Sequence, residues 1–335
     1  MSTVAELVRQ LRDSAGIAHK RDIGKVVRTL GQREMDAGVT AVPVGDDCAA
    51  IPDGDGYLLF AIEGILGELV AAEPWFAGYC GVLVNVSDIY AMGGRPLAVV
   101  DALWSRGGDA AQPLLDGMAA AAERYQVPVV GGHSNRRSAH EQLAVAITGR
   151  ARRLLTSFDA RPGQNLVVAL DLRGQYHEPY NYWNASTEAP PQRLRDDLEL
   201  LPRIAEDGLC GAAKDISMAG VVGTMLMLLE CSGIGASIDV DAIPLPPGVP
   251  LARWLHTFPS YGFILSVDDD RLDAVVARFR ARGLACAAVG RTSAARTVHL
   301  TRGGDHALLW DFSREQLTGC GPATPSKPHQ ENRNA

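Results

Sequence analysis

The sequence predicts a two-domain protein that combines α/β and α+β architecture. Three observations support this prediction: a length of 335 residues, an alternation of helical and strand patterns, and hairpin signals in both halves of the chain. The hairpins favour two separate layers of helices and sheet over one doubly wound sheet. We place the domains at 1–152 and 153–320, followed by a disordered tail at 321–335, which is rich in Pro, Ser and Asn.

The first half is predicted to contain four helices and two groups of strands. Ser2 and Thr3 can cap the first helix, in which apolar residues recur at helical spacing. The turn sequence PDGDG predicts a hairpin over 40–62, and Pro74 suits the first turn of a long helix that ends at Gly93-Gly94. The other expected elements are helices at 20–30 and 112–125, strands at 97–103, 128–130 and 142–149, and a loop with the sequence GGHSNRRS before the last strand.

The second half begins near Arg152 and alternates between strands and helices. A polar and aromatic loop is expected over 173–191. The aromatic residues Tyr180, Tyr182 and Trp183 in this loop are expected to pack rather than to recognise a substrate. The predicted strands are 165–172, 237–243, 262–267 and 286–290, the predicted helices are 192–206, 217–230 and 271–282, and a hairpin is centred on 302–305.

The composition excludes several classes of protein. The formal net charge of −7 argues against a protein that binds a nucleic-acid backbone. No uncharged stretch of 18 residues and no signal peptide is present, so we expect no membrane partner. The six cysteines are widely spaced and form no CxxC pair, which fits a reducing cytoplasm. The dinucleotide, P-loop, hydrolase, protein-kinase and zinc-protease motifs are all missing.

Two acidic motifs in the first half are candidates for a metal site. Asp46 and Asp47 follow Gly45, and two adjacent carboxylates repel each other unless a cation lies between them. Mg²⁺ prefers such oxygen ligands together with substrate phosphates. A solvated turn explains the same pair equally well. Asn85 and Asp88 lie one helical turn apart within an apolar helix, where polar groups need a partner or a cavity, although they could also form a surface face.

Glycines and a third acidic motif complete the candidate site. Glycines let backbone amides approach phosphate oxygens, but a simple turn is the better explanation of the pair at 131–132 if that motif is taken alone. Asp215 and Ser217 can cap the following apolar helix, or Asp215 can bind a metal or phosphate at the positive helix end. Glu63 ends a strand and is either a fifth ligand or an ordinary charge. The glycines that could bring backbone amides close to a phosphate are Gly93 and Gly94 beside Arg95, and Gly131 and Gly132 before His133 and Asn135.

Four of these motifs, taken in order, resemble one superfamily of enzymes. The motifs are GDDCA, NVSDIYAMGGRP, VPVVGGHSN and KDISMAGVVGTMLMLLECSGIGASID, and the resemblance covers roughly residues 40–310. They are similar to motifs of AIR synthase, FGAM synthetase, thiamine-monophosphate kinase, selenophosphate synthetase and the HypE-type maturation protein. The similarity is strongest to AIR synthase-related proteins.

The resemblance implies an N-terminal α/β domain whose sheet pairs across a homodimer into a barrel, and a C-terminal α+β domain. It also implies ATP in a cleft, with Mg²⁺ between the phosphates and the carboxylates. Asp46, Asp47, Glu63, Asp88 and Asp215 would hold the metal. The residues expected near the nucleotide are Asn85, Gly93, Gly94, Gly131, Gly132 and Lys214, and the residues expected in catalysis are Asp46, Asp88 and His133.

Departures from the superfamily motifs argue against the specific activities of several members. The first cysteine is Cys48, which disfavours selenide chemistry, and His133 replaces the Asp of the thiamine-phosphate enzyme. The expected function is therefore ATP- and Mg²⁺-dependent phosphorylation of an amide, carbonyl or carboxylate oxygen in a small molecule, which activates it for amination, cyclisation or dehydration. The alternatives are a small-molecule kinase and a non-catalytic nucleotide-binding subunit.

Overall fold

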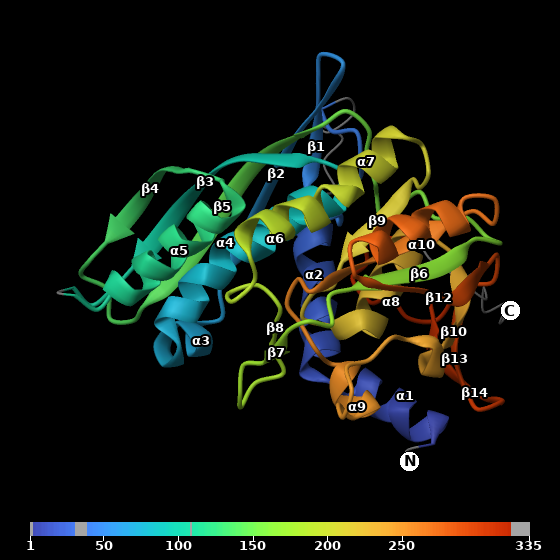
Figure 1. Cartoon of the computed structure of the whole chain (residues 1–335). Helices are drawn as coiled ribbons and strands as arrows, with labels where there is room; N and C mark the ends of the chain where they lie inside the picture. Colours follow the sequence, from blue (N-terminus) through green and yellow to red (C-terminus); the bar gives the residue numbers. More distant parts are fainter. Residues whose placement is uncertain (1–2, 31–38, 108, 323–335) are drawn as a thin grey trace, which may run out of the picture.

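The computed structural model describes residues 3–30, 39–107 and 109–322, and two β-sheets organise them (Figure 1). The elements of the first half are α1 (Val4–Arg12), α2 (Ala15–Leu30), β1 (Ala49–Asp53), β2 (Gly56–Gly64), α3 (Gly67–Ala72), α4 (Pro74–Ala91), β3 (Arg95–Trp104), α5 (Gln112–Tyr125), β4 (Val129–Asn135) and β5 (Gln142–Ala151). Those of the second half are β6 (Asn165–Leu170), β7 (Gln175–Tyr176), β8 (Trp183–Asn184), α6 (Pro191–Leu198), α7 (Leu200–Glu206), β9 (Ala212–Asp215), α8 (Gly220–Ser232), β10 (Gly235–Asp239), the 3₁₀ helix η2 (Val240–Ala242), α9 (Leu251–Trp254), β11 (Gly262–Val267), α10 (Leu272–Ala281), β12 (Ala285–Ser293), β13 (Thr297–Arg302) and β14 (Asp305–Asp311).

The first sheet has five strands in the order β1-β2-β5-β3-β4, and helices cover one of its faces. All neighbouring strands are antiparallel except β3 and β4. Side chains alternate between the two faces of a strand. Leu59, Val99 and Ile147 are therefore buried beneath α4 and α5, whereas Phe60 and Ile62 are exposed on the opposite face.

Strand β4 is longer than the sequence predicts. We expected a strand to end at Val130 and a loop to follow, but β4 continues to Asn135. The extension forms because β4 pairs in parallel with β3, from Val100 opposite Gly131 to Trp104 opposite Asn135. The predicted first strand of the hairpin is conversely shorter, since regular pairing begins only at Ala49 and the residues before it form turns.

The second sheet has seven strands in the order β14-β13-β10-β12-β6-β11-β9. All neighbouring strands are antiparallel except β10 and β13. Strand β6 is central and fully buried, so it contributes side chains to both faces. Val167 and Ala169 join the core shared with α4 and α10, while Leu166 and Val168 pack in the core that contains α8.

The first helix packs against the second sheet rather than against the first. The predicted cap is present, since the Thr3 hydroxyl accepts a hydrogen bond from the Glu6 amide at 3.2 Å. Leu7, Leu11 and Ile17 are buried in the core formed around α8 and Trp310. The grouping of residues 1–152 as one domain therefore does not describe the first two helices. The predicted end of the second helix at Gly31 lies outside the described residues.

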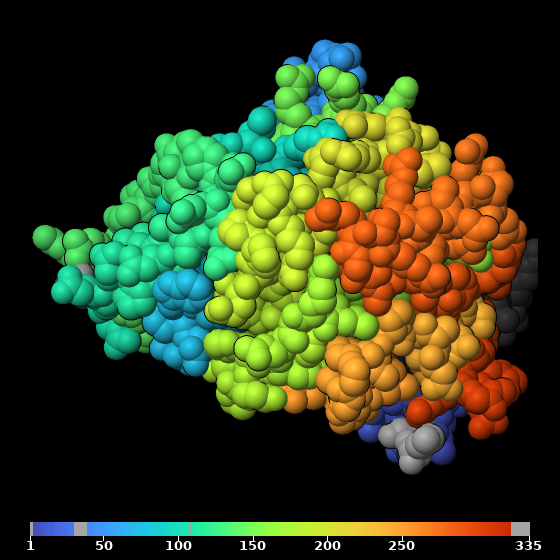
Figure 2. Space-filling model, viewed as in Figure 1, coloured from blue at the N-terminus to red at the C-terminus, as the bar shows by residue number. Residues whose placement is uncertain are grey.

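Helices α6 and α7 lie between the two halves of the molecule. Figure 2 shows the chain around residues 175–205, in yellow-green, filling the space between the blue-green first half and the orange second half. The predicted single helix over 192–206 is two helices that meet at Glu199. Arg95 at the start of β3 forms ion pairs at 2.7 Å with Glu199 and Glu206, which fixes α7 to the first sheet.

The C-terminal tail, the helices and the cysteines add three observations. Most of the predicted disordered tail, residues 323–335, lies outside the described residues. In the described parts of the chain, no helix has the length and apolar character needed to cross a membrane. All six cysteines are free, which agrees with their wide spacing in the sequence.

Candidate functional site

Three carboxylates from distant parts of the sequence meet at the junction of the two halves. Asp47 comes from the turn before β1, Asp88 from α4, and Asp215 from the end of β9. One ligand atom of each lies within 4.8 Å of the ligand atoms of the other two. The convergence that the sequence predicts for these residues is therefore present, and their role as metal ligands stays a prediction.

The local structure explains why the carboxylates of Asp88 and Asp215 are free to act as metal ligands. Asp88 is buried on α4, and its Oδ2 atom has no hydrogen-bond partner among the described residues. Asp215 does not cap α8, because that helix begins at Gly220 after Ala219 and has no side-chain cap. The Asp215 carboxylate instead accepts a hydrogen bond from Ser260 at 3.3 Å, which leaves it directed toward the other carboxylates.

Lys214 pairs directly with Asp47 inside this cluster. Both side chains are only 6% exposed, and Nζ of Lys214 contacts Oδ1 of Asp47. Burial opposes the lysine charge, but Asp47 and Asp46 outweigh it and raise the pKa of Lys214. Asp46 is turned away and accepts hydrogen bonds from the Ser157 amide at 2.8 Å and hydroxyl at 2.7 Å. Asp46 therefore anchors the turn, while Asp47 reaches the cluster.

The electrostatics of the cluster fit a divalent cation. Burial raises the pKa of Asp88, and burial together with Asp47 raises the pKa of Asp215 to about 7. Burial also raises the pKa of Asp46 to about 6. Carboxylates held together in a buried site retain protons unless a cation compensates their charge. The unsatisfied Asp88 oxygen and the all-oxygen donor set suit Mg²⁺.

A cavity opens beside the cluster, and we call it the acidic cavity. Asp88 and Asp215 line it together with Glu63 at the end of β2 and Lys20 on α2. Burial raises the pKa of Glu63, and the nearby Lys20 opposes that change. Burial and the charge of Lys214 lower the pKa of Lys20. The acidic cavity therefore contains both the carboxylates that could bind a metal and a lysine that could face a phosphate.

Lys20 is a residue of the acidic cavity that the sequence motifs do not reveal. Lys20 is one turn after the buried Ile17 on α2, so it lies on the face of that helix that points into the protein. A lysine on the buried face of an amphipathic helix was the available signal. The sequence could not show which cavity this face meets, because α2 and the carboxylates are far apart along the chain.

Several predicted nucleotide contacts lie elsewhere. Asn85 is buried and donates to the Gly81 carbonyl at 2.8 Å. Gly93 has a φ of +74° and packs against the Arg153 carbonyl, and Gly94 packs against Leu59, so close packing accounts for both glycines. None of these residues lines the acidic cavity.

The glycines before His133 are also distant from the cluster. Gly131, Gly132 and His133 are exposed on β4, the edge strand of the first sheet. They do not line the acidic cavity. They are paired with β3 in the first sheet and therefore do not form the loop that the sequence predicts. Their assignment to the nucleotide and to catalysis stays a prediction that a single chain does not support.

The aromatic residues of the 173–191 segment pack, as the sequence predicts. The rings of Tyr180 and Tyr182 stack with centroids 5.0 Å apart, and Tyr182 meets Phe258 edge to face at 4.9 Å. The Trp183 indole donates to the Asp171 carbonyl at 2.8 Å. Tyr182 also lines the acidic cavity, so this packing forms one of its walls.

Comparison with known proteins shows which family this chain matches. Residues 45–151 match the N-terminal domain and residues 167–302 the C-terminal domain of AIR synthase related proteins. An uncharacterized protein of Synechocystis sp. is 48% identical over 317 residues, which cover 94% of this chain and 98% of that protein. A selenide, water dikinase of Aeromonas hydrophila is 26% identical over 275 residues, covering 75% of this chain and 77% of the relative.

A solved structure supports the same fold. Thermotoga maritima PurL complexed with ATP superimposes with a TM-score of 0.70 at 20% identity, covering 95% of this chain and 55% of PurL. This chain thus spans about half the length of that protein. The matches to both domains and the full-length relatives agree with the order of the motifs around Asp47, Asp88 and Asp215. The chain belongs to the AIR synthase related family.

Proposed function

We propose that this protein is an ATP- and Mg²⁺-dependent enzyme that phosphorylates an amide, carbonyl or carboxylate oxygen of a small molecule. The observation that carries the proposal is the meeting of Asp47, Asp88 and Asp215 within 4.8 Å beside a cavity that Lys20 also lines. Two relatives support the general chemistry, since one is named a selenide, water dikinase and the other was solved with ATP.

The residues divide the work of phosphoryl transfer between them. Asp47, Asp88 and Asp215 would hold Mg²⁺, which when bound neutralises charge on the phosphates. Lys20 and Lys214 supply further positive charge, while Ser157 and Asp46 hold the turn that carries Asp47. The acceptor oxygen forms a bond to the γ-phosphorus. The bond from that phosphorus to the β,γ-bridging oxygen breaks, and its electron pair leaves with ADP.

A homodimer built through the first sheet is part of the proposal. The uncovered face of that sheet carries exposed apolar side chains, among them Ile62 at 63% and Phe60 at 45% exposure. Contiguous exposed apolar surface of this kind marks an interaction site. The predicted role of His133 and of the glycines on β4 at the nucleotide would require the paired sheets of such a dimer.

Calorimetry with ATP and Mg²⁺ tests the nucleotide site. We expect Asp88→Asn to weaken binding at least about tenfold, which corresponds to about 1.4 kcal/mol. Asp46→Asn should have a smaller effect, because Asp46 is hydrogen-bonded to Ser157 rather than directed into the cluster. Asp305→Asn, at an exposed aspartate in β14, is the matched control. Equal affinity in all four proteins would remove the site assignment.

Product analysis then identifies the type of reaction. A screen of amides, carboxylates and amino alcohols for ADP release would find acceptors. Release of free phosphate together with a new C–N bond or a dehydrated product is expected for an activating enzyme. A stable phosphorylated product would instead identify a small-molecule kinase. Nucleotide binding without turnover of any acceptor would favour a non-catalytic subunit.

A further inference from the structure

The acidic cavity combines a group of charged side chains with an apolar wall. Lys20, Glu63, Asp88 and Asp215 line it, and Lys20 lies close enough to Glu63 and Asp215 to interact with them electrostatically. A molecule bound in this cavity would therefore have a polar group beside these charges and an apolar group against the wall. The apolar and aromatic side chains of the wall include Ile65, Leu66, Leu69, Val84, Tyr182 and Phe258.

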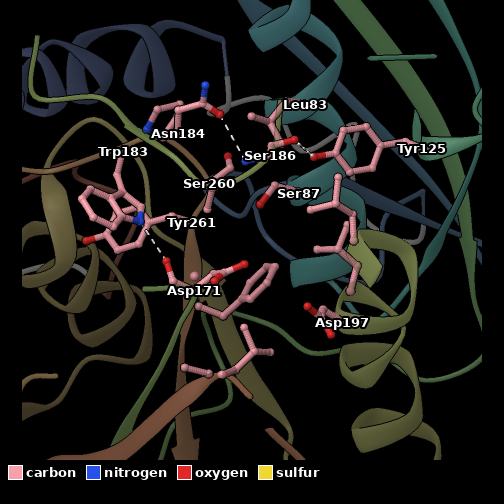
Figure 3. A pocket seen from close by; sticks show the side chains of 18 of the residues that line it. Leu83, Ser87, Tyr125, Asp171, Trp183, Asn184, Ser186, Asp197, Ser260 and Tyr261 are labelled. Carbon is pink, nitrogen blue, oxygen red and sulfur yellow. Dashed lines mark hydrogen bonds between the residues drawn. The ribbon is translucent and has the colours of Figure 1, made fainter. Parts of the chain in front are cut away.

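The volume of the acidic cavity suits a small molecule. It is about 130 Å³, close to the roughly 150 Å³ of an engineered apolar cavity that holds benzene. The nucleoside part of ATP is larger than this volume and would lie outside the cavity. Pro259 and Ser260 also line the neighbouring space shown in Figure 3, which measures only about 60 Å³. Of these two spaces, the acidic cavity is therefore the one that can hold an acceptor beside the carboxylate cluster.

Lys20 brings a positive charge without a direct partner to the acidic cavity. Its side chain is half-buried, and its ammonium group forms no ion pair or hydrogen bond with any residue that the structure describes. Lys214, in contrast, is paired with Asp47. An ammonium group can only donate hydrogen bonds, and a bond from it to an ionised oxygen is about twice as strong as a bond between neutral groups. Lys20 therefore favours an occupant with an anionic oxygen.

Ser217 supplies a second donor without a partner. Its Oγ atom is buried and has no hydrogen-bond partner among the described residues. Ser217 lines the acidic cavity two residues after Asp215, and it does not cap α8, which has no side-chain cap. Leaving a buried hydroxyl unpaired is costly, and a ligand oxygen would satisfy it. A carboxylate has two oxygens and can accept hydrogen bonds from Lys20 and Ser217 together.

The charges around the acidic cavity favour an acceptor with a single negative charge. With Mg²⁺ bound, the cation and Lys214 together balance the three carboxylates of the cluster. Lys20 balances Glu63, with which it interacts electrostatically. A monocarboxylate then adds one negative charge beside a lysine and a divalent cation. A phosphate ester would add about two negative charges beside the same carboxylates, which repel them.

We propose that the acidic cavity is the acceptor site and that it takes a small monocarboxylate with a short apolar chain, whose carboxylate accepts hydrogen bonds from Lys20 and Ser217. This inference rests on the proposed function and names the substrate class for it. One carboxylate oxygen forms a bond to the γ-phosphorus, the bond from that phosphorus to the β,γ-bridging oxygen breaks, and its electron pair leaves with ADP. The product is an acyl phosphate. No proton has to be removed, because a carboxylic acid is already ionised at neutral pH.

Matched acid and amide probes test the substrate class. Acetate, isobutyrate and isovalerate are compared with acetamide, isobutyramide and isovaleramide, which have the same shapes but no charge. Ligand-observed NMR with the full chain, Mg²⁺ and a non-hydrolysable ATP analogue should show at least about tenfold tighter binding of each branched acid than of its amide. Both branched acids should bind more tightly than acetate, because their chains bury apolar area against the wall. Equal or tighter binding of the amides would overturn the proposal, as would the absence of binding of all three acids at millimolar concentrations.

Variants of the two donors test the position of the carboxylate. Lys20→Met should abolish the preference for isobutyrate over isobutyramide, whereas Lys20→Arg should keep it because the positive charge remains. Lys25→Met, at an exposed lysine of the same helix, is the matched control and should also keep the preference. Ser217→Ala should weaken isobutyrate binding about fivefold, the effect of losing one hydrogen bond. An unchanged preference in Lys20→Met would refute the site.

The affinity for Mg²⁺ and ATP, measured by calorimetry without a carboxylate, separates the two proposals. A wild type that binds Mg²⁺ and ATP but shows no preference for the acids would refute the acceptor class alone. A wild type that binds neither Mg²⁺ nor ATP would refute the proposed function, and the acceptor class with it.

Discussion

At the residue scale, the pairing of Lys214 with Asp47 controls the charge of the cluster. Removal of one partner from a buried ion pair leaves an uncompensated charge, which costs about 3 to 5 kcal/mol. We therefore expect Lys214→Met to lower the free energy of unfolding by about 3 kcal/mol in urea denaturation. The double variant Lys214→Met/Asp47→Asn should recover most of this loss, because its second change removes the stranded charge. Additive losses in the double variant would contradict the coupling.

The raised carboxyl pKa values predict how stability depends on pH. The pKa of Asp46 rises from 3.8 to about 6 and that of Asp215 from 3.8 to about 7. The folded protein therefore holds protons at pH values where the unfolded chain has already released them. The contribution of these protonated carboxyls to the stability of the folded state is fully present below pH 4 and is lost as the pH rises to about 7. Without metal, the melting temperature should be higher at pH 5 than at pH 8.

Addition of Mg²⁺ should restore the stability that the folded protein loses at the higher pH. The cation competes with protons for the same carboxylates, so it stabilises the folded state more at pH 8 than at pH 5. Differential scanning calorimetry with EDTA or with Mg²⁺ at both pH values measures the effect. Equal stabilisation by Mg²⁺ at pH 5 and pH 8 would contradict the assignment of these carboxylates to the cation.

Sequence reasoning identified the carboxylates but not the whole site. Asp47, Asp88 and Asp215 stand in motifs that look unusual locally, since charged residues adjoin glycines or apolar runs. Lys20 has no such local mark, and only the packing of α2 against the rest of the chain directs it into the acidic cavity. For His133 only the local structure differs from the prediction: a loop was expected after Val130, while the pairing of β4 with β3 makes His133 part of an edge strand, and its role at the nucleotide stays a prediction.

At the scale of elements, α8 supports the turn that carries Asp46 and Asp47 through Glu230. This carboxylate is 1% exposed and accepts hydrogen bonds from the Leu317 amide at 2.8 Å, the Thr318 amide at 2.7 Å and the Thr318 hydroxyl at 2.6 Å. The segment thus held brings Cys320 against Gly45, where a Cβ atom would lie 2.4 Å from the cysteine Cβ. Gly45 begins the turn that carries the two aspartates.

Glu230→Ala should therefore destabilise the protein and also weaken metal binding. Loss of the carboxylate leaves several buried donors unsatisfied, so we expect the free energy of unfolding to fall by about 3 kcal/mol. Affinity for Mg²⁺ and ATP should fall as the turn loosens. Urea denaturation and calorimetry measure the two effects, and Glu123→Ala, at an exposed glutamate on α5, is the control. Unchanged stability would contradict the role of Glu230 as an anchor.

Elements were easier to predict than their connections. The apolar run of α8 is long enough to place the helix from the sequence, and its end at Gly233 agrees with the left-handed conformation there, φ +69°. The same apolar run treats Glu230 as the polar end of an apolar helix. Its partners at 317–319 are more than 80 residues away, and no local pattern links them to it.

At the scale of the whole molecule, the first sheet should form the dimer interface. Ile62 lies opposite Ala146, and Ala146 lies opposite Val100, so these residues form one row across three strands on the uncovered face. Ile62→Asp would place a charge in the centre of the interface, where burial of an unpaired charge is strongly unfavourable. Analytical ultracentrifugation should therefore find the wild type as a dimer and Ile62→Asp as a monomer. Leu308→Asp, at a position 47% exposed on β14, should remain dimeric. A wild type that sediments as a monomer at micromolar concentration, or an Ile62→Asp variant that stays dimeric, would contradict this interface.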